Sequence, residues 1–380
     1  MAAAAVVSLS AVIAVSVQAL GPRASSGSSD GRRHGTPSAA RAASTGGLTF
    51  GIYPGGAAGA VALAGRTIAE DPGKRLAALE QLRSPGRPFV LHIFASYTGR
   101  GSASPAEEVG REIALYTSAG FHIELVLTYR PVGGSPAQNI AGFADFARLA
   151  MRSFGGNRRF VALQVTNEAN VRGAPAAADG AYPGAEHALI GGVVAADAEA
   201  RRHGYGQVGI GFNWAYAVGP GEATFWSRLG RVGGVTFRRS LDWIGLDIYP
   251  RTWGPTVEGS LTAATRKAVL ASLRGLRGRY LPLAGIPARV PLHISENGYP
   301  TGPGRTEAMQ VTAMKAAVST VFANRSIYGV TDFRWFDLRD ADSSSPTFES
   351  RYGLMRDDYS PKAGFSVYRK LVATLTRGRH

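Results

Sequence analysis

The sequence predicts a closed (β/α)8 barrel, and the main evidence is a repeated alternation of two patterns. Short apolar runs rich in β-branched residues alternate with longer stretches whose apolar residues recur at three- and four-residue spacing. Eight such alternations between residues 48 and 380 favour a closed barrel over an open doubly wound sheet. Neither a glycine-rich dinucleotide-binding pattern after the first strand nor a Walker-type phosphate loop is present.

The strands are expected where short apolar runs are bounded by glycine- and proline-rich loops. They cover residues 48–53, 89–96, 122–128, 160–166, 207–213, 243–248, 290–295 and 332–336. Helical spacing of apolar residues is clear in residues 143–154, before the fourth strand, and in residues 365–375 at the end of the chain. The chain is therefore expected to end with the eighth helix of the barrel.

The first 47 residues are expected to lie outside the barrel. Residues 1–20 form an apolar run of small residues ending in Val17-Gln18-Ala19, which is typical of a secretory signal peptide and its small-x-small cleavage site. Because no positive charge precedes this run, an uncleaved anchor at the cell surface is the alternative. Residues 21–47 are mainly Ser, Gly, Arg and Ala, which predicts a disordered linker. We expect a secreted barrel domain over residues 48–380, without stable membrane insertion after signal removal.

The 380-residue chain has a formal net charge of +15 and contains no cysteine. The lack of cysteine excludes disulfides, thiolate metal sites and a cysteine nucleophile. The basic residues are mostly scattered arginines that form no continuous stripe, so we expect no nucleic-acid partner. No group of His, Asp and Glu has the spacing of a metal site, and we expect a monomer that needs no metal or other cofactor.

Two glutamates follow apolar strands directly and are the strongest candidates for chemistry. Glu168 comes after the run Phe160–Val165, and Glu296 comes after Val290–Ile294. A carboxylate at the end of a buried strand loses hydration, so such acids tend to occur where a site uses them. The carboxyl ends of barrel strands gather at one rim. Paired carboxyls there can hydrolyse an acetal, one protonating the leaving oxygen and one stabilising the cationic sugar carbon. Structural ion pairs with arginines are the alternative.

The residues around both glutamates resemble those of retaining glycoside hydrolases of clan A. Asn167-Glu168 is similar to the Asn-Glu pair that ends strand four in that clan. Residues 295–298 (Ser-Glu-Asn-Gly) are similar to the Glu-Asn-Gly motif of its family 1, and residues 352–354 (Tyr-Gly-Leu) to its usual ending. The resemblance extends from residue 48 to about residue 375 and is closest to families 5 and 39.

This resemblance implies roles for particular side chains. Glu296 would be the nucleophile of a double displacement, and Glu168 the general acid and then the general base. Asn167 would hydrogen-bond the sugar 2-hydroxyl, Tyr249 would contact the nucleophile, and Trp335 would form the floor of the −1 subsite.

Other aromatic residues are candidates for further subsites. Trp214, Tyr216 and Trp253 follow neighbouring strands, and aromatic faces stack well on pyranose rings. His92 and His293 are expected to be hydrogen-bonded core histidines. The sequence also departs from family 5, since Ala169 follows the Asn-Glu pair and His92 is a weak substitute for that family's arginine on strand two.

Three hypotheses follow for the function. The first is an exported retaining O-glycosyl hydrolase that cleaves β-glycosidic bonds in an oligosaccharide, polysaccharide or glycoside. The second is a catalytically inactive barrel that binds polysaccharide or another anionic polymer at the cell surface. The third is nucleic-acid or anionic-polymer binding driven by net charge, which would depend steeply on salt and not on Glu168. The sugar and the position of the cleaved bond stay open, because subsites are built by variable loops.

Overall fold

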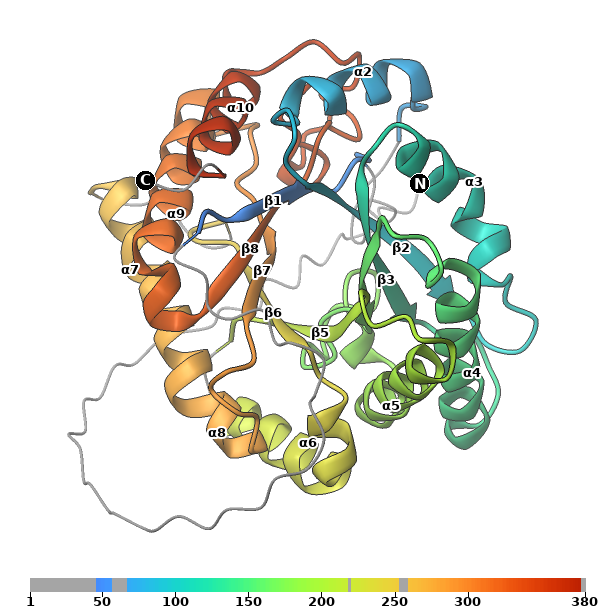
Figure 1. The fold of residues 1–380 in the computed structure, drawn as a ribbon. Helices are drawn as coiled ribbons and strands as arrows, with labels where there is room; N and C mark the ends of the chain where they lie inside the picture. The colour runs from blue at the N-terminus through green and yellow to red at the C-terminus, as the bar shows by residue number, and fades with distance from the viewer. Residues whose placement is uncertain (1–45, 57–66, 218–219, 253–258, 377–380) are drawn as a thin grey trace, which may run out of the picture. The chain divides into compact units, whose positions relative to one another are not determined.

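The computed structural model describes residues 46–56, 67–217, 220–252 and 259–376. In these ranges eight parallel strands form a closed barrel in chain order, with β8 paired to β1 (Figure 1). The strands are β1 (Thr49–Ile52), β2 (Phe89–Tyr97), β3 (His122–Tyr129), β4 (Phe160–Val165), β5 (Gly209–Ala215), β6 (Trp243–Ile248), β7 (Leu292–Asn297) and β8 (Val330–Trp335). The expected barrel is confirmed, and each strand lies within two residues of its expected bounds.

Helices surround the barrel and connect its strands. They are α2 (Pro72–Leu82), α3 (Pro105–Ser118), α4 (Pro136–Phe154), α5 (Ala185–His203), α6 (Pro220–Arg239), α7 (Leu261–Gly275), α8 (Leu281–Ala284), α9 (Glu307–Tyr328) and α10 (Ala363–Leu375), with short turns η1 (Asp179–Ala181), η2 (Leu276–Tyr280) and η3 (Phe348–Ser350). Local sequence determines where several begin: Asp71, Ser104 and Ser135 cap α2, α3 and α4, each followed by proline at the start of the helix.

The strands divide their side chains between two environments, because alternate residues of a strand point to opposite faces. In β8, Phe333 lies close to Phe50 of β1, which itself contacts Tyr368 of α10 in the helix layer. Arg334, the next residue, points into the barrel and binds Glu124 of β3. The outer face of the sheet therefore supplies the apolar core, while the barrel interior holds a polar cluster below the strand ends.

The N-terminal predictions fall outside the described residues. The expected signal peptide and all but the last two residues of the linker lie within residues 1–45, so both stay predictions. Among the helices of the described ranges, none combines the length and apolarity needed to cross a membrane.

Candidate active site

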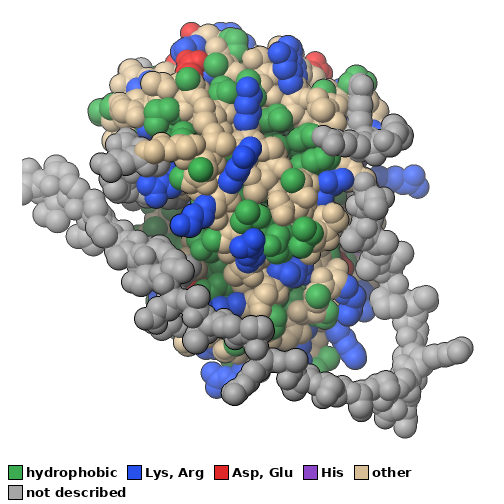
Figure 2. Space-filling view, turned by 90° about the vertical axis from the view of Figure 1, so that its left-hand side faces the viewer, with side chains coloured by type: hydrophobic (Ala, Val, Ile, Leu, Met, Phe, Trp, Pro, Cys, Tyr) green, Lys and Arg blue, Asp and Glu red, His purple; other side chains and the backbone are tan. Residues whose placement is uncertain are grey.

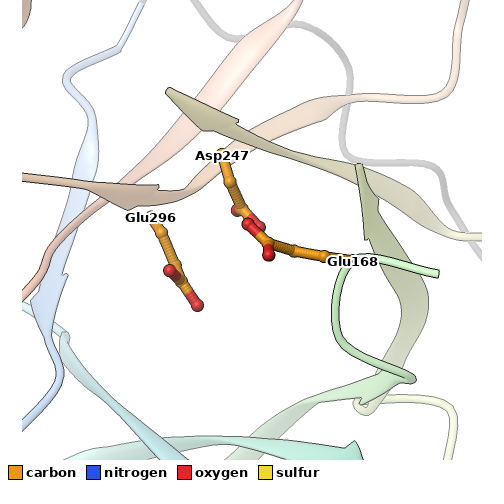
Figure 3. A group of neighbouring side chains, drawn as sticks. All are labelled: Glu168, Asp247 and Glu296. Carbon is orange, nitrogen blue, oxygen red and sulfur yellow. The ribbon is translucent and has the colours of Figure 1, made fainter. Parts of the chain in front are cut away.

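Three carboxyl groups meet at the carboxyl ends of β4, β6 and β7. They belong to Glu168, which follows β4, to Asp247 within β6 and to Glu296 within β7. One oxygen atom of each lies within 4.8 Å of the others. Figure 3 shows the three side chains extending from different strands toward one space. The structure thus brings the two expected glutamates together and adds a third acid that the sequence analysis had not singled out.

Burial and mutual repulsion change the acidity of this group. Burial, the charge of Glu296 and then that of Asp179 raise the pKa of Glu168 to about 8. Burial and the charges of Glu296 and Glu168 also raise the pKa of Asp247 well above its ordinary value. Carboxyl groups this close cannot all be ionised at neutral pH. The site therefore holds protons on carboxyl groups at a pH where most exposed carboxyls are ionised, as a general acid requires.

Glu296 is held from two sides. The Tyr249 hydroxyl donates a hydrogen bond of 2.6 Å to Oε2, and His92 Nε2 lies 3.7 Å from Oε1. The other ring nitrogen of His92, Nδ1, lies 2.7 Å from Oε1 of Glu124. Burial lowers the pKa of His92, but the hydrogen bond to Glu124 and the negative charges of Glu124 and Glu296 outweigh it and raise the pKa. His92 is a buried core histidine, as expected, and it also links Glu296 to the polar cluster of the barrel interior.

A strained turn orients Glu168. Thr166 and Glu168 have φ angles of 66° and 50°, which lie in the left-handed region that non-glycine residues rarely adopt. Such residues persist only where their surroundings hold them. Here the Asn167 N–H donates to Oδ2 of Asp179 (2.7 Å), and the Glu168 N–H donates to Oδ1 of Asn213 (2.8 Å). Two side chains from other parts of the fold therefore fix the backbone that carries Glu168.

Asp179 connects the ends of β3 and β4. This fully buried carboxyl group accepts hydrogen bonds from the backbone N–H groups of Tyr129 (2.8 Å) and Asn167 (2.7 Å), and Arg130 Nε lies 3.5 Å away. Burial raises the pKa of Asp179 to about 7, although these hydrogen bonds act in the opposite direction. Because Asp179 lies in the loop after β4, no strand pattern in the sequence marked it.

Replacing Asp179 by alanine is expected to lower the free energy of unfolding by about 2–4 kcal/mol, because it leaves buried backbone donors without an acceptor. Urea unfolding followed by circular dichroism measures this change. Asp145→Ala is the matched control, since Asp145 is exposed on α4 and forms an ion pair with Arg148 one turn away; its effect should stay within about 0.5 kcal/mol. Equal stabilities of the two variants would contradict the positioning role of Asp179.

Asn167 lies beside Glu168, as expected, but its amide is already engaged by the protein. Nδ2 donates to the Ala177 carbonyl (3.0 Å), and Oδ1 accepts from Asn213 Nδ2 (2.8 Å). The side chain is 5% exposed. Contact with a substrate hydroxyl stays a prediction, whereas a positioning role in the Glu168 turn follows from these contacts.

The structure corrects the expectation for Trp335. Trp335 is 1% exposed, and its ring packs against Tyr368 of α10 with centroids 6.1 Å apart. The physical reason is strand alternation: Arg334 points into the barrel, so Trp335 faces the helix layer. The next residue, Phe336, is partly exposed, stacks on Tyr53 (5.2 Å) and contacts Tyr249 edge-on (6.3 Å). Phe336 is therefore the aromatic residue of this strand end that lies beside the site.

Trp214 is also misassigned as a substrate-binding residue. It is fully buried on the outer face of β5, where its ring packs against Trp226 of α6 and Tyr280 of η2. Its indole N–H donates to Glu222 (2.6 Å), so the polar edge is satisfied within the protein. The neighbouring Asn213 points inward instead and donates to Asp247. Tyr216 is half-buried, and Trp253 lies outside the described residues.

Comparison with known proteins places the fold. No protein-family model matches the chain, and no curated protein does. A β-glucosidase from Exiguobacterium marinum superposes with a TM-score of 0.57 at 12% identity, covering 86% of this chain and 97% of that one. A family 1 β-glucosidase from Thermotoga maritima superposes with a TM-score of 0.56 at 15% identity, covering 86% of this chain and 97% of that one. A family 39 glycoside hydrolase from Bacteroides cellulosilyticus WH2 superposes with a TM-score of 0.55 at 13% identity, covering 87% of this chain and 64% of that one. The chain therefore has the (β/α)8 barrel fold found in glycoside hydrolases of families 1 and 39.

Proposed function

We propose that this protein is a glycoside hydrolase that cleaves β-glycosidic bonds with retention of configuration. The observation that carries the proposal is the pair Glu168 and Glu296, whose oxygens approach within 4.8 Å at the strand ends. Retaining enzymes hold their two carboxyl groups about 5–5.5 Å apart, whereas inverting enzymes separate them by roughly 6.5–9.5 Å to admit a water molecule. The close approach thus supports a covalent intermediate.

The contacts of the two glutamates support a division of roles. Glu296 acts as the nucleophile on the anomeric carbon, oriented by the hydrogen bond from Tyr249 and by His92. Glu168, with its pKa raised to about 8, first donates its proton to the leaving oxygen. It then accepts a proton from the water that hydrolyses the glycosyl–enzyme ester. In the first step the bond from the anomeric carbon to the leaving oxygen is replaced by a bond to Glu296, and in the second step that bond is replaced by a bond to the water oxygen. Glu168 gives up one proton in the first step and takes one up in the second.

The names of the structural neighbours support the substrate class. Two are β-glucosidases and one is a family 39 glycoside hydrolase. The proposed substrate is accordingly a glycoside, oligosaccharide or polysaccharide with a β-linkage. Secretion, or attachment at the cell surface through the N-terminus, is part of the proposal and is supported by the apolar run of residues 1–20.

The stereochemistry of the first product tests the proposal. A panel of aryl β-glycosides (glucoside, xyloside, mannoside and galactoside) is incubated with the full chain, and proton NMR follows the anomeric signals before mutarotation. At least one substrate should be hydrolysed, and its β-anomer should appear first. An α-anomer as the first product would overturn retention, and binding of the matching polymers without hydrolysis of any substrate would favour the inactive barrel.

A further inference from the structure

Three helices on one side of the barrel form a continuous outer face. Helix α9 packs against both α7 and α10, so the three lie side by side in the order α7, α9, α10 (Figure 1). These helices follow β6, β7 and β8 in the chain and lie on the outside of the barrel, whereas the site lies at the strand ends (Figure 1). The side chains on the outer surface of these helices can therefore bind a ligand independently of the catalytic site.

The charge on this side is almost entirely positive. Residues 259–295, which include all of α7, contain six basic residues and no Asp or Glu: Arg266, Lys267, Arg274, Arg277, Arg279 and Arg289. Helix α9 adds Lys315 and Arg325 and one acid, Glu307, which pairs with Arg356; α10 adds Arg369 and Lys370. Figure 2 shows Lys and Arg side chains spread over this face, with Asp and Glu side chains near its upper edge.

We call Arg266, Lys267, Lys315, Arg369 and Lys370 the basic face. All five are exposed, and none of them forms an ion pair with a carboxylate of the described residues. The contrast with helices α4 to α6 is clear. There, several arginines are paired with acids, in the couples Arg148–Asp145, Arg152–Glu199, Arg201–Asp197 and Arg228–Glu186. The basic face therefore carries five positive charges without a compensating carboxylate among the described residues, which creates an attractive field for a polyanion.

A shallow hollow lies between α9 and α10 within this face. It has a volume of about 220 Å³ and is lined by Lys315, Lys370, Thr374 and the aliphatic side chains of Val367, Leu371 and Leu375. This is smaller than the roughly 300–1,000 Å³ of most small-molecule pockets. Two ammonium groups over an aliphatic floor suit a single ring that carries one anionic group and presents C–H bonds on its face.

We propose that the basic face is a docking surface for an anionic polysaccharide, with one acidic sugar residue seated between Lys315 and Lys370. An aliphatic floor suits the C–H face of a sugar, whereas single-stranded nucleic acid is usually held by aromatic rings that stack on its bases. Combined with the proposed function, on which this consequence rests, docking would raise the local concentration of glycosidic bonds near the enzyme. Binding itself does not depend on turnover.

Binding of polygalacturonate to the full chain tests the proposal. Affinity is measured by biolayer interferometry at about 50 mM and about 200 mM salt, because contacts to a polyanion weaken with salt. The test variant combines R266E, K267E, K315E and K370E. The matched control combines K74E, R87E, R111E and R158E, which change the net charge equally at exposed residues of other faces. The test variant should bind about tenfold or more weakly, a loss of about 1.4 kcal/mol, while the control stays within about threefold of the wild type.

Three results would overturn the proposal. They are equal losses in both variants, equal binding of fully methyl-esterified polygalacturonate, and tighter binding of single-stranded DNA through the same four residues. Hydrolysis of aryl β-glycosides is measured in parallel and should be the same in both variants. Failure of docking with intact hydrolysis would then count against the basic face alone, and absence of hydrolysis with intact docking against the proposed function alone.

Discussion

Replacing Glu296 by alanine is expected to reduce kcat for aryl β-glycosides by roughly 10⁵-fold or more, since loss of a catalytic nucleophile removes most of the rate enhancement. Without the carboxylate no covalent intermediate forms at the anomeric carbon. The cavity left by the side chain admits a small anion. Added azide should therefore restore turnover and give a glycosyl azide of inverted configuration, which proton NMR identifies.

Tyr249→Phe is the matched control for this experiment. It removes the 2.6 Å hydrogen bond to Glu296 but leaves the carboxylate in place. Its kcat should fall by only about 10- to 100-fold, the cost of losing one hydrogen bond to a charged group, and azide should not change it. A folded Glu296→Ala protein, verified by circular dichroism, that azide does not rescue would refute the nucleophile assignment.

The sequence allowed the barrel and the Glu168–Glu296 pair to be predicted because both depend on local patterns. Apolar runs mark the strands, and an acid after such a run lies at the rim once the barrel closes. The same signal also occurs at Asp247 in β6 and at Glu124 in β3. Asp247 could thus have been found from sequence, since it is an acid inside an otherwise apolar strand.

Glu124 shows why this signal is insufficient by itself. Although burial disfavours its charge, Arg334 and the neighbouring histidines hold the pKa of Glu124 well below its ordinary value. It is a structural anion deep in the barrel. Among the described residues, Glu168 and Asp247 form no ion pair with an arginine or lysine, and their pKa values move upward. Whether the pKa of a buried acid is lowered or raised therefore depends on its partners from distant strands, and the spacing of residues along the chain does not reveal those partners.

The aromatic residues were harder to assign because the direction of a side chain at a strand end depends on register. A shift of one residue reverses every side chain between the two faces of a strand. Trp335 and Trp214 are therefore in the helix layer, while their neighbours Phe336 and Asn213 belong to the site. Asp179 was missed for another reason, since its role arises from loop geometry alone.

Replacing Glu168 by glutamine is expected to separate the two chemical steps. Glutamine keeps the shape of the side chain but cannot donate a proton as an acid or accept one as a base. General acid catalysis contributes about 10²–10⁴-fold, and it matters most when the leaving group is poor. An unactivated β-glycoside should lose that factor in kcat/KM, whereas a dinitrophenyl β-glycoside, which leaves without protonation, should lose little. Stopped-flow absorbance should then show a burst, because the second step still lacks its base.

The pH dependence gives an independent test of Glu168. The wild-type acid must be protonated in the first step, so its kcat/KM should fall as pH rises through about 8, the value to which its pKa is raised. With the unactivated β-glycoside, the residual activity of the Glu168→Gln variant should lack this basic limb. Asp145→Asn on α4 removes an exposed carboxylate and should leave the limb unchanged. If the basic limb persisted in Glu168→Gln, another group would be the acid, and Asp247, whose pKa is also raised by burial and by the charges of Glu296 and Glu168, would be the first to examine.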